Sequence, residues 1–279
     1  MANEELVNQI MSAVLQRVDA QATKAPAAAS VSSAAVGAPK GALPPIPGRM
    51  PAVTEFVGAS ALGDTIGLVI PNVDPQIHAL MGIDPKFRSI GIIGDRTGAG
   101  PQIFAADEAV KATNTEILKI ELARDTKGGA GHGSLIIFGA EDVSDARRAV
   151  EVTLADVERT MGDVYGNEAG HLEFQYTARA SYALNKAFGA PIGKAFGITV
   201  GAPAAIGVVL ADTAAKAATI DIIGYSSPAQ GTSFSNEVIA TFAGDSGAVR
   251  QAIIAAREVG RDLLAALGDY PESTTTPYI

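Results

Sequence analysis

The first eighteen residues, MANEELVNQIMSAVLQRV, carry apolar side chains at steps of three and four. That spacing places them on one face of a helix, so an amphipathic helix is predicted over residues 1–18. Such a helix is marginal alone and needs a surface that covers its apolar face. Docking to a partner protein is favoured over packing on the chain's own body. A membrane surface is the least favoured alternative, because the polar face is poor in Lys and Arg. The apolar face consists of Leu6, Val7, Ile10, Met11, Val14, Leu15 and Val18.

The periodic pattern stops at residues 19–53, which are rich in Ala, Pro, Ser and Gly and have few large apolar side chains. A segment of this composition cannot bury enough apolar surface to fold, so a flexible linker is predicted. A sticky helix at the end of such a linker is the arrangement expected of a docking segment.

The rest of the hydrophobic pattern occurs twice. The stretch AADEAVKATNTEIL at 105–118 matches LADTAAKAATIDII at 210–223, and each is typical of a helix followed by a β-branched strand. The acidic and basic positions of the two copies also correspond, pairing Asp107 with Asp212 and Lys111 with Lys216.

A second pair of segments follows, DVSDARRAVEV at 142–152 and DSGAVRQAIIA at 245–255. Both begin with an Asp that is a candidate N-cap and continue as amphipathic helices. Each copy therefore predicts the order strand, helix, strand, glycine-containing loop, strand, helix. This order predicts an α+β fold in which helices pack on a small antiparallel or mixed sheet.

The predicted domains are residues 54–165 and residues 166–270, followed by a C-terminal tail over 271–279. The loops RDTKGGAGHGS at 124–134 and SSPAQGTSFSN at 226–236 occupy equivalent places in the two copies but share little chemistry. A phosphate-binding or catalytic loop needs particular residues, whereas a loop that shapes an opening needs only small residues and a tight turn.

Composition excludes several classes of function. The net charge is −9 and no basic run is present, so nucleic acid is not an expected partner. The chain has no Cys, which excludes disulfides, thiolate metal sites and cysteine nucleophiles. No apolar run reaches the roughly 18 residues that cross a membrane, and a soluble cytosolic protein is expected.

Motifs of catalysis are equally weak. The glycine loops lack the Lys-Ser/Thr ending of a nucleotide-binding P-loop, and no dinucleotide fingerprint is present. GDSG at 244–247 resembles a serine-protease motif, but Asp245 and Ser246 are better explained as a helix cap. The three histidines, His78, His132 and His171, lack metal-ligand spacing and are expected in surface or loop positions. No catalytic residue, metal site or cofactor is predicted.

Residues 210–260 resemble the bacterial microcompartment (BMC) shell domain. They share its Ala-Asp…Lys-Ala helix, a strand, a pore-region loop, a second strand and a Gly-Asp before the last helix, and residues 105–152 are a more diverged copy. TEFVG at 54–58, YTARASYALNKAFGAPIGKA at 176–195 and the terminal PYI are similar to the trimeric shell subunits of propanediol-utilisation microcompartments. The resemblance implies two tandem, circularly permuted BMC domains and a homotrimeric, pseudo-hexagonal shell tile.

The resemblance also implies roles for particular residues. Lys111 and Lys216 fall at the tile-edge lysine of the family, although an ordinary exposed lysine is the alternative. The two loops fall at the pore region, where short polar groups would admit small polar metabolites such as diols. The pore candidates are Gly128, Gly129, Gly131, His132, Gly133, Gln230, Gly231, Thr232 and Ser233.

The expected protein is a non-enzymatic shell subunit of a microcompartment. Its expected partners are further copies of itself, other shell proteins and encapsulated enzymes, the last held through the N-terminal helix. A tandem-domain regulatory protein is the main alternative, and it would bind one small molecule tightly without forming sheets. An enzyme that uses the glycine loop is a third, and it would lose turnover when His132 is replaced by Ala.

Overall fold

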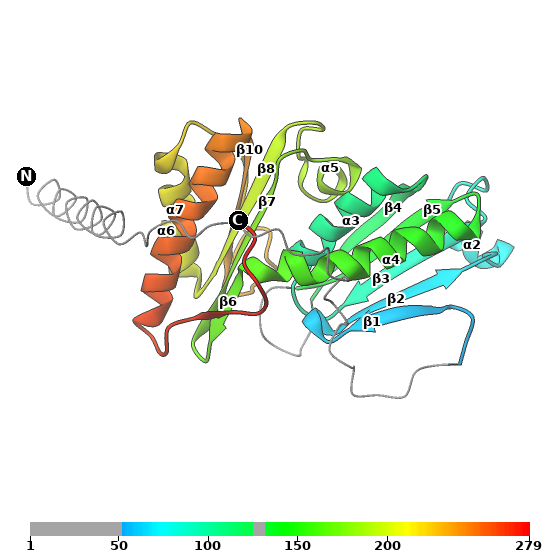
Figure 1. Cartoon of the computed structure of the whole chain (residues 1–279), viewed down its shortest axis with the longest axis horizontal. Helices are drawn as coiled ribbons and strands as arrows, with labels where there is room; N and C mark the ends of the chain where they lie inside the picture. Colours follow the sequence, from blue (N-terminus) through cyan, green and yellow to red (C-terminus); the bar gives the residue numbers. More distant parts are fainter. Residues whose placement is uncertain (1–51, 125–131) are drawn as a thin grey trace, which may run out of the picture. The chain divides into compact units, whose positions relative to one another are not determined.

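The computed structural model describes residues 52–124 and 132–279, all within the compact unit Leu43–Ile279. The predicted helix 1–18, nearly all of the linker 19–53 and the pore candidates Gly128, Gly129 and Gly131 lie outside these residues. Over the described residues the chain forms two antiparallel sheets, each with helices packed against it (Figure 1). The predicted α+β class is therefore confirmed.

The first sheet has the spatial order β1-β2-β3-β5-β4, and every neighbouring pair is antiparallel. Long helices α3 and α4 pack together, and α4 crosses β1, β2, β3 and β5. The strands are β1 (Phe56–Ser60), β2 (Thr65–Ile70), β3 (Ser89–Asp95), β4 (Glu116–Ala123) and β5 (Gly133–Ala140). The helices are the 3-10 turn η1 (Leu62–Asp64), α2 (Pro75–Met81), α3 (Gly100–Ala112) and α4 (Val143–Thr160).

The second sheet has the order β11-β6-β7-β8-β10-β9, again antiparallel throughout. Helices α6 and α7 pack on it and on each other. The strands are β6 (Val164–Asn167), β7 (Gly170–Thr177), β8 (Ala195–Ala202), β9 (Asp221–Ser226), β10 (Val238–Gly244) and β11 (Glu272–Ser273). The helices are η2 (Met161–Asp163), α5 (Tyr182–Phe188), α6 (Ala204–Ala217) and α7 (Ser246–Ala265).

The two sheets reproduce the predicted repeat. In each copy a central strand leads to a helix, an edge strand, a loop, a second central strand and a long helix. The structure adds two strands and a short helix at the start of each copy, β1-β2-α2 in the first and β6-β7-α5 in the second. Both short helices have seven residues and end at a left-handed glycine, Gly82 or Gly189, where a residue without Cβ is favoured.

The predicted helix caps have different outcomes. At the start of α7 the Asp245 carboxylate accepts hydrogen bonds from the Gly247 and Ala248 amides at 2.9 and 3.3 Å. This confirms that Asp245 caps the helix, so the GDSG motif is explained as the start of α7 and not as a protease motif. Asp142 occupies the N-cap position of α4, but its side chain makes no capping hydrogen bond. The expected equivalence of the two caps is therefore only positional.

The apolar core is continuous across the two copies. Ile103 and Phe104 of α3 and Leu184 of α5 lie in the same buried cluster as Phe196 of β8. The rings of Phe104 and Phe196 stack with their centroids 6.1 Å apart. Full burial of one such side chain contributes about 1.5–3 kcal/mol, so this packing fixes the placement of one copy on the other.

Candidate functional site

The junction between the two copies is held by a buried carboxylate as well as by apolar side chains. Asp107 on α3 accepts hydrogen bonds from the backbone amides of Ser181 and Leu184 at 3.0 and 3.2 Å. These amides belong to the start of α5, whose own Ser181 makes no side-chain cap. Burial raises the pKa of Asp107, and the nearby Lys111 opposes that rise. Asp107 thus caps a helix of the other domain.

The two tile-edge candidates have different surroundings. Lys111 lies 3.0 Å from Asp107 and 2.7 Å from Glu108, and its side chain is 25% exposed. Lys216 pairs with Asp212 at 2.7 Å, and its side chain is 76% exposed. Lys111 therefore has a structural task at the junction, whereas Lys216 projects into solvent.

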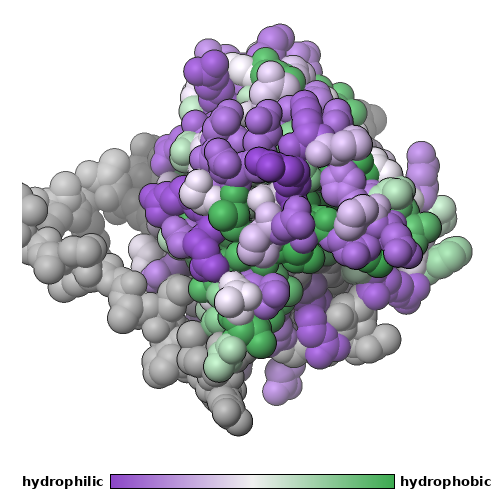
Figure 2. Space-filling view, turned by 90° about the vertical axis from the view of Figure 1, so that its right-hand side faces the viewer, coloured by the Kyte–Doolittle hydropathy of each residue, from purple (hydrophilic) through white to green (hydrophobic). Residues whose placement is uncertain are grey.

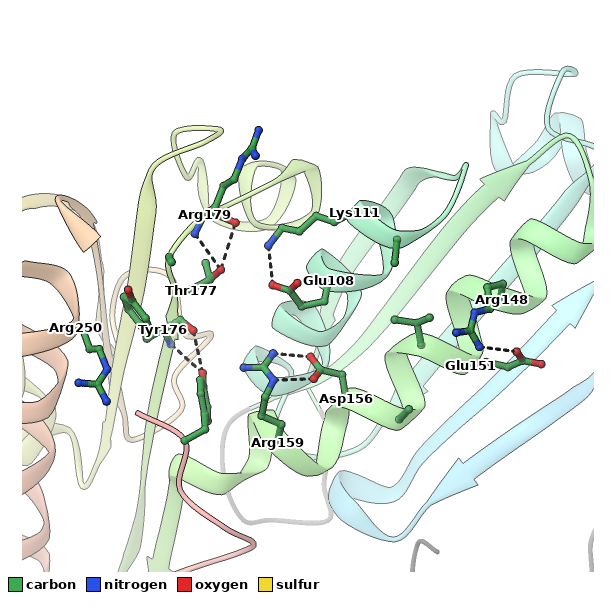
Figure 3. A pocket seen from close by; sticks show the side chains of 15 residues that line it. Glu108, Lys111, Arg148, Glu151, Asp156, Arg159, Tyr176, Thr177, Arg179 and Arg250 are labelled. Carbon is green, nitrogen blue, oxygen red and sulfur yellow. Dashed lines mark hydrogen bonds and ion pairs between the residues drawn. The ribbon is translucent and has the colours of Figure 1, made fainter. Parts of the chain in front are cut away.

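Lys111 also lines an open groove of about 850 Å³ between the two copies (Figure 3). Helices α3 and α4 form one wall, and β7 with the C-terminal Tyr278 forms the opposite side. Figure 3 shows Asp156 facing Arg159 along α4, and their closest nitrogen and oxygen are 2.6 Å apart. The acidic side chains of the groove are each paired with a cation, namely Glu108 with Lys111, Glu151 with Arg148 and Asp156 with Arg159.

The two predicted pore loops meet at their bases. Nε2 of His132 lies 3.1 Å from the carbonyl oxygen of Thr232. Nη1 of Arg124, at the other end of the first loop, donates to the carbonyl oxygen of Ser233 at 2.7 Å. Of the predicted surface or loop positions, His132 occupies a loop position directly before β5, and it is only 9% exposed there. The burial follows from its place between the two copies.

The second loop has a tight conformation. Gly231, Ser233 and Phe234 all have positive φ, at 100°, 51° and 67°. Side-chain-bearing residues rarely adopt this region, so the loop must be held by its contacts. The Phe234 amide donates to the Pro228 carbonyl at 3.0 Å, and the Phe234 ring remains 80% exposed. Gln230 is also exposed, whereas Thr232 is fully buried.

Gly133 has a packing role. It is the buried first residue of β5, and a Cβ there would collide with the carbonyl oxygen of Asp95. Of the nine pore candidates, the structure brings His132 together with Thr232 and places Gln230, Gly231 and Ser233 on the exposed side of the second loop.

Glu237 is a site residue that no sequence motif predicted, and it lies between two histidines. Its Oε1 is 3.2 Å from Nδ1 of His132, and its Oε2 is 3.4 Å from Nε2 of His171. Burial alone would raise the pKa of Glu237, but the hydrogen bonds from both histidines outweigh it and lower the pKa to about 2. The hydrogen bond to Glu237 in turn raises the pKa of His132. An acidic residue directly before the apolar strand VIATFAG was the available signal.

A small cavity of about 40 Å³ lies beside this cluster, where His132, Glu173 and Glu237 join the start of α3 and several apolar side chains in its lining. Glu173 is 2% exposed, and among the described residues its Oε1 has no hydrogen-bond partner. Burial raises its pKa well above the usual value, and the charges of Glu237 and Asp95 add to the shift. The space suffices for ordered water, but it is too small for a larger ligand.

On the other side of Glu237 is an open pocket of about 240 Å³, lined by His171, Ser235 and Asn236 among others. Glu237 therefore separates an internal cavity from the surface. Within residues 52–124 and 132–279, no group of three or more acidic or histidine side chains is arranged to hold a metal ion. In the same part of the chain, no helix combines the length and the apolar character that crossing a bilayer requires.

Comparison with known proteins gives consistent matches. The BMC domain family matches residues 89–168 and 195–270. The bacterial microcompartment shell protein PduB of Salmonella typhimurium is 58% identical over 284 residues that span both chains completely. The PduB of Limosilactobacillus reuteri is 54% identical, over 81% of this chain and 95% of the relative. The crystal structure of a trimeric PduB shell protein superimposes with a TM-score of 0.79 at 54% identity, covering 81% of this chain and all of that one.

Proposed function

The chain belongs to the bacterial microcompartment shell proteins, and from this premise we propose that it forms a homotrimeric shell tile that admits small polar metabolites. Its relatives are shell proteins, which confirms the expectation of a structural protein rather than an enzyme. The alternative of a tandem-domain regulatory protein loses its support. The observation that supports the trimer is a helix–helix contact between the two copies. The chain forms this contact once, between α3 and α5, and the equivalent surfaces of α6 and α2 remain exposed.

Helix α3 buries apolar side chains in the internal contact, whereas the equivalent side chains of α6, its counterpart in the second copy, are exposed. Ile103 and Phe104 of α3 are 0% and 2% exposed because they pack at the junction. Counting from the matched Asp107 and Asp212, their counterparts on α6 are Val208 and Val209. These valines are 48% and 40% exposed.

The other half of the contact also has an exposed counterpart, since α5 is buried against α3 whereas the equivalent helix α2 exposes apolar side chains. Leu184, three residues after the N-cap of α5, is fully buried against α3. Ile77, three residues after the N-cap of α2, is 50% exposed, and Leu80 on the same helix is 84% exposed. Figure 2 looks onto the side of the molecule where α2 lies in Figure 1, and hydrophobic side chains reach the surface there between hydrophilic ones.

A second copy supplies what each bare surface lacks. If α6 of one chain receives α2 of the next, the contact repeats the internal packing of α3 on α5. Such a head-to-tail interface closes into a ring when its rotation fits a whole number of chains. Three chains with two domains each give six similar units around one axis, and a related shell protein of 54% identity is trimeric.

The mass of the full chain in solution tests this ring. We expect a trimer for the wild type and a monomer for Ile77→Glu/Leu80→Glu, because two buried carboxylates would oppose the apolar contact. Leu267→Glu is the matched control, since Leu267 is 56% exposed just after α7 and belongs to neither α2 nor α6. A trimer for the double variant, or a wild-type monomer, would refute the proposed ring.

For metabolite passage, we propose that the paired loops surround an opening. The bonds from His132 and Arg124 to the second loop support this, because repetition of that contact around a ring would bring all six loops together. Short hydroxyls and backbone amides suit diols. Saturation-transfer NMR with 1,2-propanediol should show weak binding that Gln230→Trp reduces and the exposed α7 control Gln251→Trp leaves unchanged. Equal signals in all three proteins would contradict the assignment.

For enzyme attachment, we propose that residues 1–18 dock encapsulated enzymes through their apolar face, with residues 19–53 as the tether. The support is the amphipathic pattern of the sequence. Deletion of residues 1–49 should leave the trimer intact and abolish co-purification of the enzyme core with the shell. Unchanged enzyme recruitment would refute the docking role.

A further inference from the structure

His132 contacts two oxygens that can only accept hydrogen bonds. Nδ1 lies at ion-pair distance, 3.2 Å, from the buried Oε1 of Glu237, which makes no hydrogen bond of good geometry within the described residues, and Nε2 lies 3.1 Å from the carbonyl oxygen of Thr232. A carboxylate held at a pKa of about 2 is ionised at neutral pH and carries no proton to donate. The ion pair with Glu237 and the hydrogen bond to Thr232 together favour the imidazolium form, which is the only form of the ring with a hydrogen on both nitrogens.

The neutral ring has one N–H and cannot make both contacts. Retaining the hydrogen on Nδ1, next to Glu237, leaves a lone pair on Nε2 facing the Thr232 carbonyl. The hydroxyl of Ser235 lies 3.5 Å from the same Nε2 and can donate to it. The geometry thus provides one partner for each protonation state of Nε2, namely Thr232 for the charged ring and Ser235 for the neutral ring.

We propose that His132 is a proton-controlled latch on the loop 227–235, which grips Thr232 when protonated and exchanges it for Ser235 when neutral. The consequence for passage rests on the proposed function, in which this loop borders the opening. The exchange of hydrogen-bond partners at His132 depends only on contacts within one chain and not on the ring or the opening.

A change in the hydrogen bond to Thr232 affects the whole loop, because Thr232 holds the loop together internally. It is fully buried, its amide donates to the Ser227 carbonyl at 3.3 Å, and its hydroxyl donates to the Ser235 carbonyl at 3.1 Å. It stands between Gly231 and Ser233, whose positive φ values depend on surrounding contacts. Losing the cross-domain hydrogen bond at Thr232 therefore loosens the strained part of the loop.

The charges around His132 set the direction. Donation from the His132 ring to the Glu237 carboxylate raises the pKa of His132, with burial and the cation of Arg124 opposing the rise. The hydrogen bond to Thr232 is thus present below this raised pKa and is lost as pH rises through it. The titratable groups that face the junction from its several elements are Asp95 on β3, Arg124 after β4, His171 and Glu173 on β7, and Glu237 before β10.

Two NMR measurements on the full chain test the latch. The first is the pKa of the His132 ring, which must lie above 6.5. The second is amide hydrogen exchange at residues 232–235, corrected for intrinsic base catalysis. We expect exchange to accelerate about tenfold across the His132 titration, and to show no such step in His132→Gln, which does not titrate. His78→Gln is the matched control and should behave as the wild type.

A His132 pKa at or below 6.5, a flat wild-type profile or an unchanged step in His132→Gln would each overturn the latch. If His132→Gln fails to fold, Ser235→Ala gives the second variant. This variant should keep the hydrogen bond from protonated His132 to Thr232 at acidic pH. At alkaline pH its amide exchange should accelerate further than in the wild type, because the neutral ring then lacks Ser235 as a partner. A Ser235→Ala profile identical to the wild type would overturn the latch. The mass of the same samples distinguishes failure of the latch from failure of the proposed trimer. A trimer whose exchange does not change with pH refutes only the latch.

Discussion

At the scale of single residues, Asp107 and Asp212 hold matching positions in the two copies but do different work. Asp107 is fully buried and caps α5, whereas Asp212 is exposed and pairs with Lys216. The corresponding helix α2 is capped by its own Asp74, which accepts from the Gln76 and Ile77 amides. An acceptor from another chain is therefore unnecessary there.

Substitution separates the two roles. Asp107→Ala should lower the free energy of unfolding by about 1–3 kcal/mol, because it leaves buried amides of α5 without an acceptor. Asp212→Ala should change it by less than about 0.5 kcal/mol, as is usual for exposed positions. Urea unfolding followed by circular dichroism measures both, and equal losses would show that Asp107 is not the cap it appears in the structure.

Glu173 makes stability depend on pH. Its folded pKa is raised above the unfolded value of 4.5, first by burial and then by Glu237 and Asp95. Above pH 4.5 the unfolded chain releases this proton while the folded chain retains it, so the contribution of Glu173 to stability falls as pH rises. Glu173→Gln, which cannot ionise, should flatten that fall by up to about 1.4 kcal/mol per pH unit. Parallel urea-midpoint curves for both proteins between pH 5 and pH 8 would exclude the effect.

The sequence predicts only part of this residue-level chemistry. Asp245 was recognisable as a cap because a local pattern suffices for a local hydrogen bond. His132, His171 and Glu237 are far apart along the chain, and only the packing of two sheets brings them together. Spacing rules for metal ligands or catalytic groups do not reach such contacts.

At the scale of elements, the C-terminal segment 277–279 fastens the end of the first copy to the second. Asp163 of η2 accepts from the amides of Tyr278 and Ile279 at 2.8 and 3.0 Å, and Arg257 of α7 pairs with Asp163 at 2.7 Å. The Tyr278 hydroxyl donates to Gln175 of β7 at 3.0 Å, and Arg159 of α4 stacks over its ring.

Removal of residues 277–279 should lower the free energy of unfolding by about 3 kcal/mol, since two donors of buried Asp163 and one apolar anchor are lost. Tyr278→Phe keeps the backbone contacts and should cost only about 1 kcal/mol. Thermal or urea unfolding of the two variants gives the comparison. A truncated chain as stable as the wild type would show that the segment merely rests on the surface.

The repeat explains which elements were predictable. The helices α3 and α6 and the strands that follow them share charged and apolar positions, so the comparison of the two copies predicts them. The hairpins β1-β2 and β6-β7 share no such residues and are equivalent only in topology. The pattern also could not tell that α5 is buried and α2 bare, because burial depends on the neighbouring copy and not on the helix itself.

At the scale of the whole molecule, the chain contains one complete junction and two halves of another. Apolar surface is buried at α3 and α5 and remains exposed at α6 and α2. Exposed apolar side chains on both complementary surfaces indicate an interface between copies. Shell assembly then requires lateral contacts of these rings, in which Lys216 is the more accessible of the two edge candidates.

Electron microscopy of the purified full chain decides whether it forms shell tiles. We expect flat, three-chain particles that associate edge to edge into sheets. Lys216→Asp should leave the particles intact and disperse the sheets, and it is cleaner than a change at Lys111, which also neutralises buried Asp107. Particles of one or two chains, or trimers that never associate laterally, would contradict the shell-tile account.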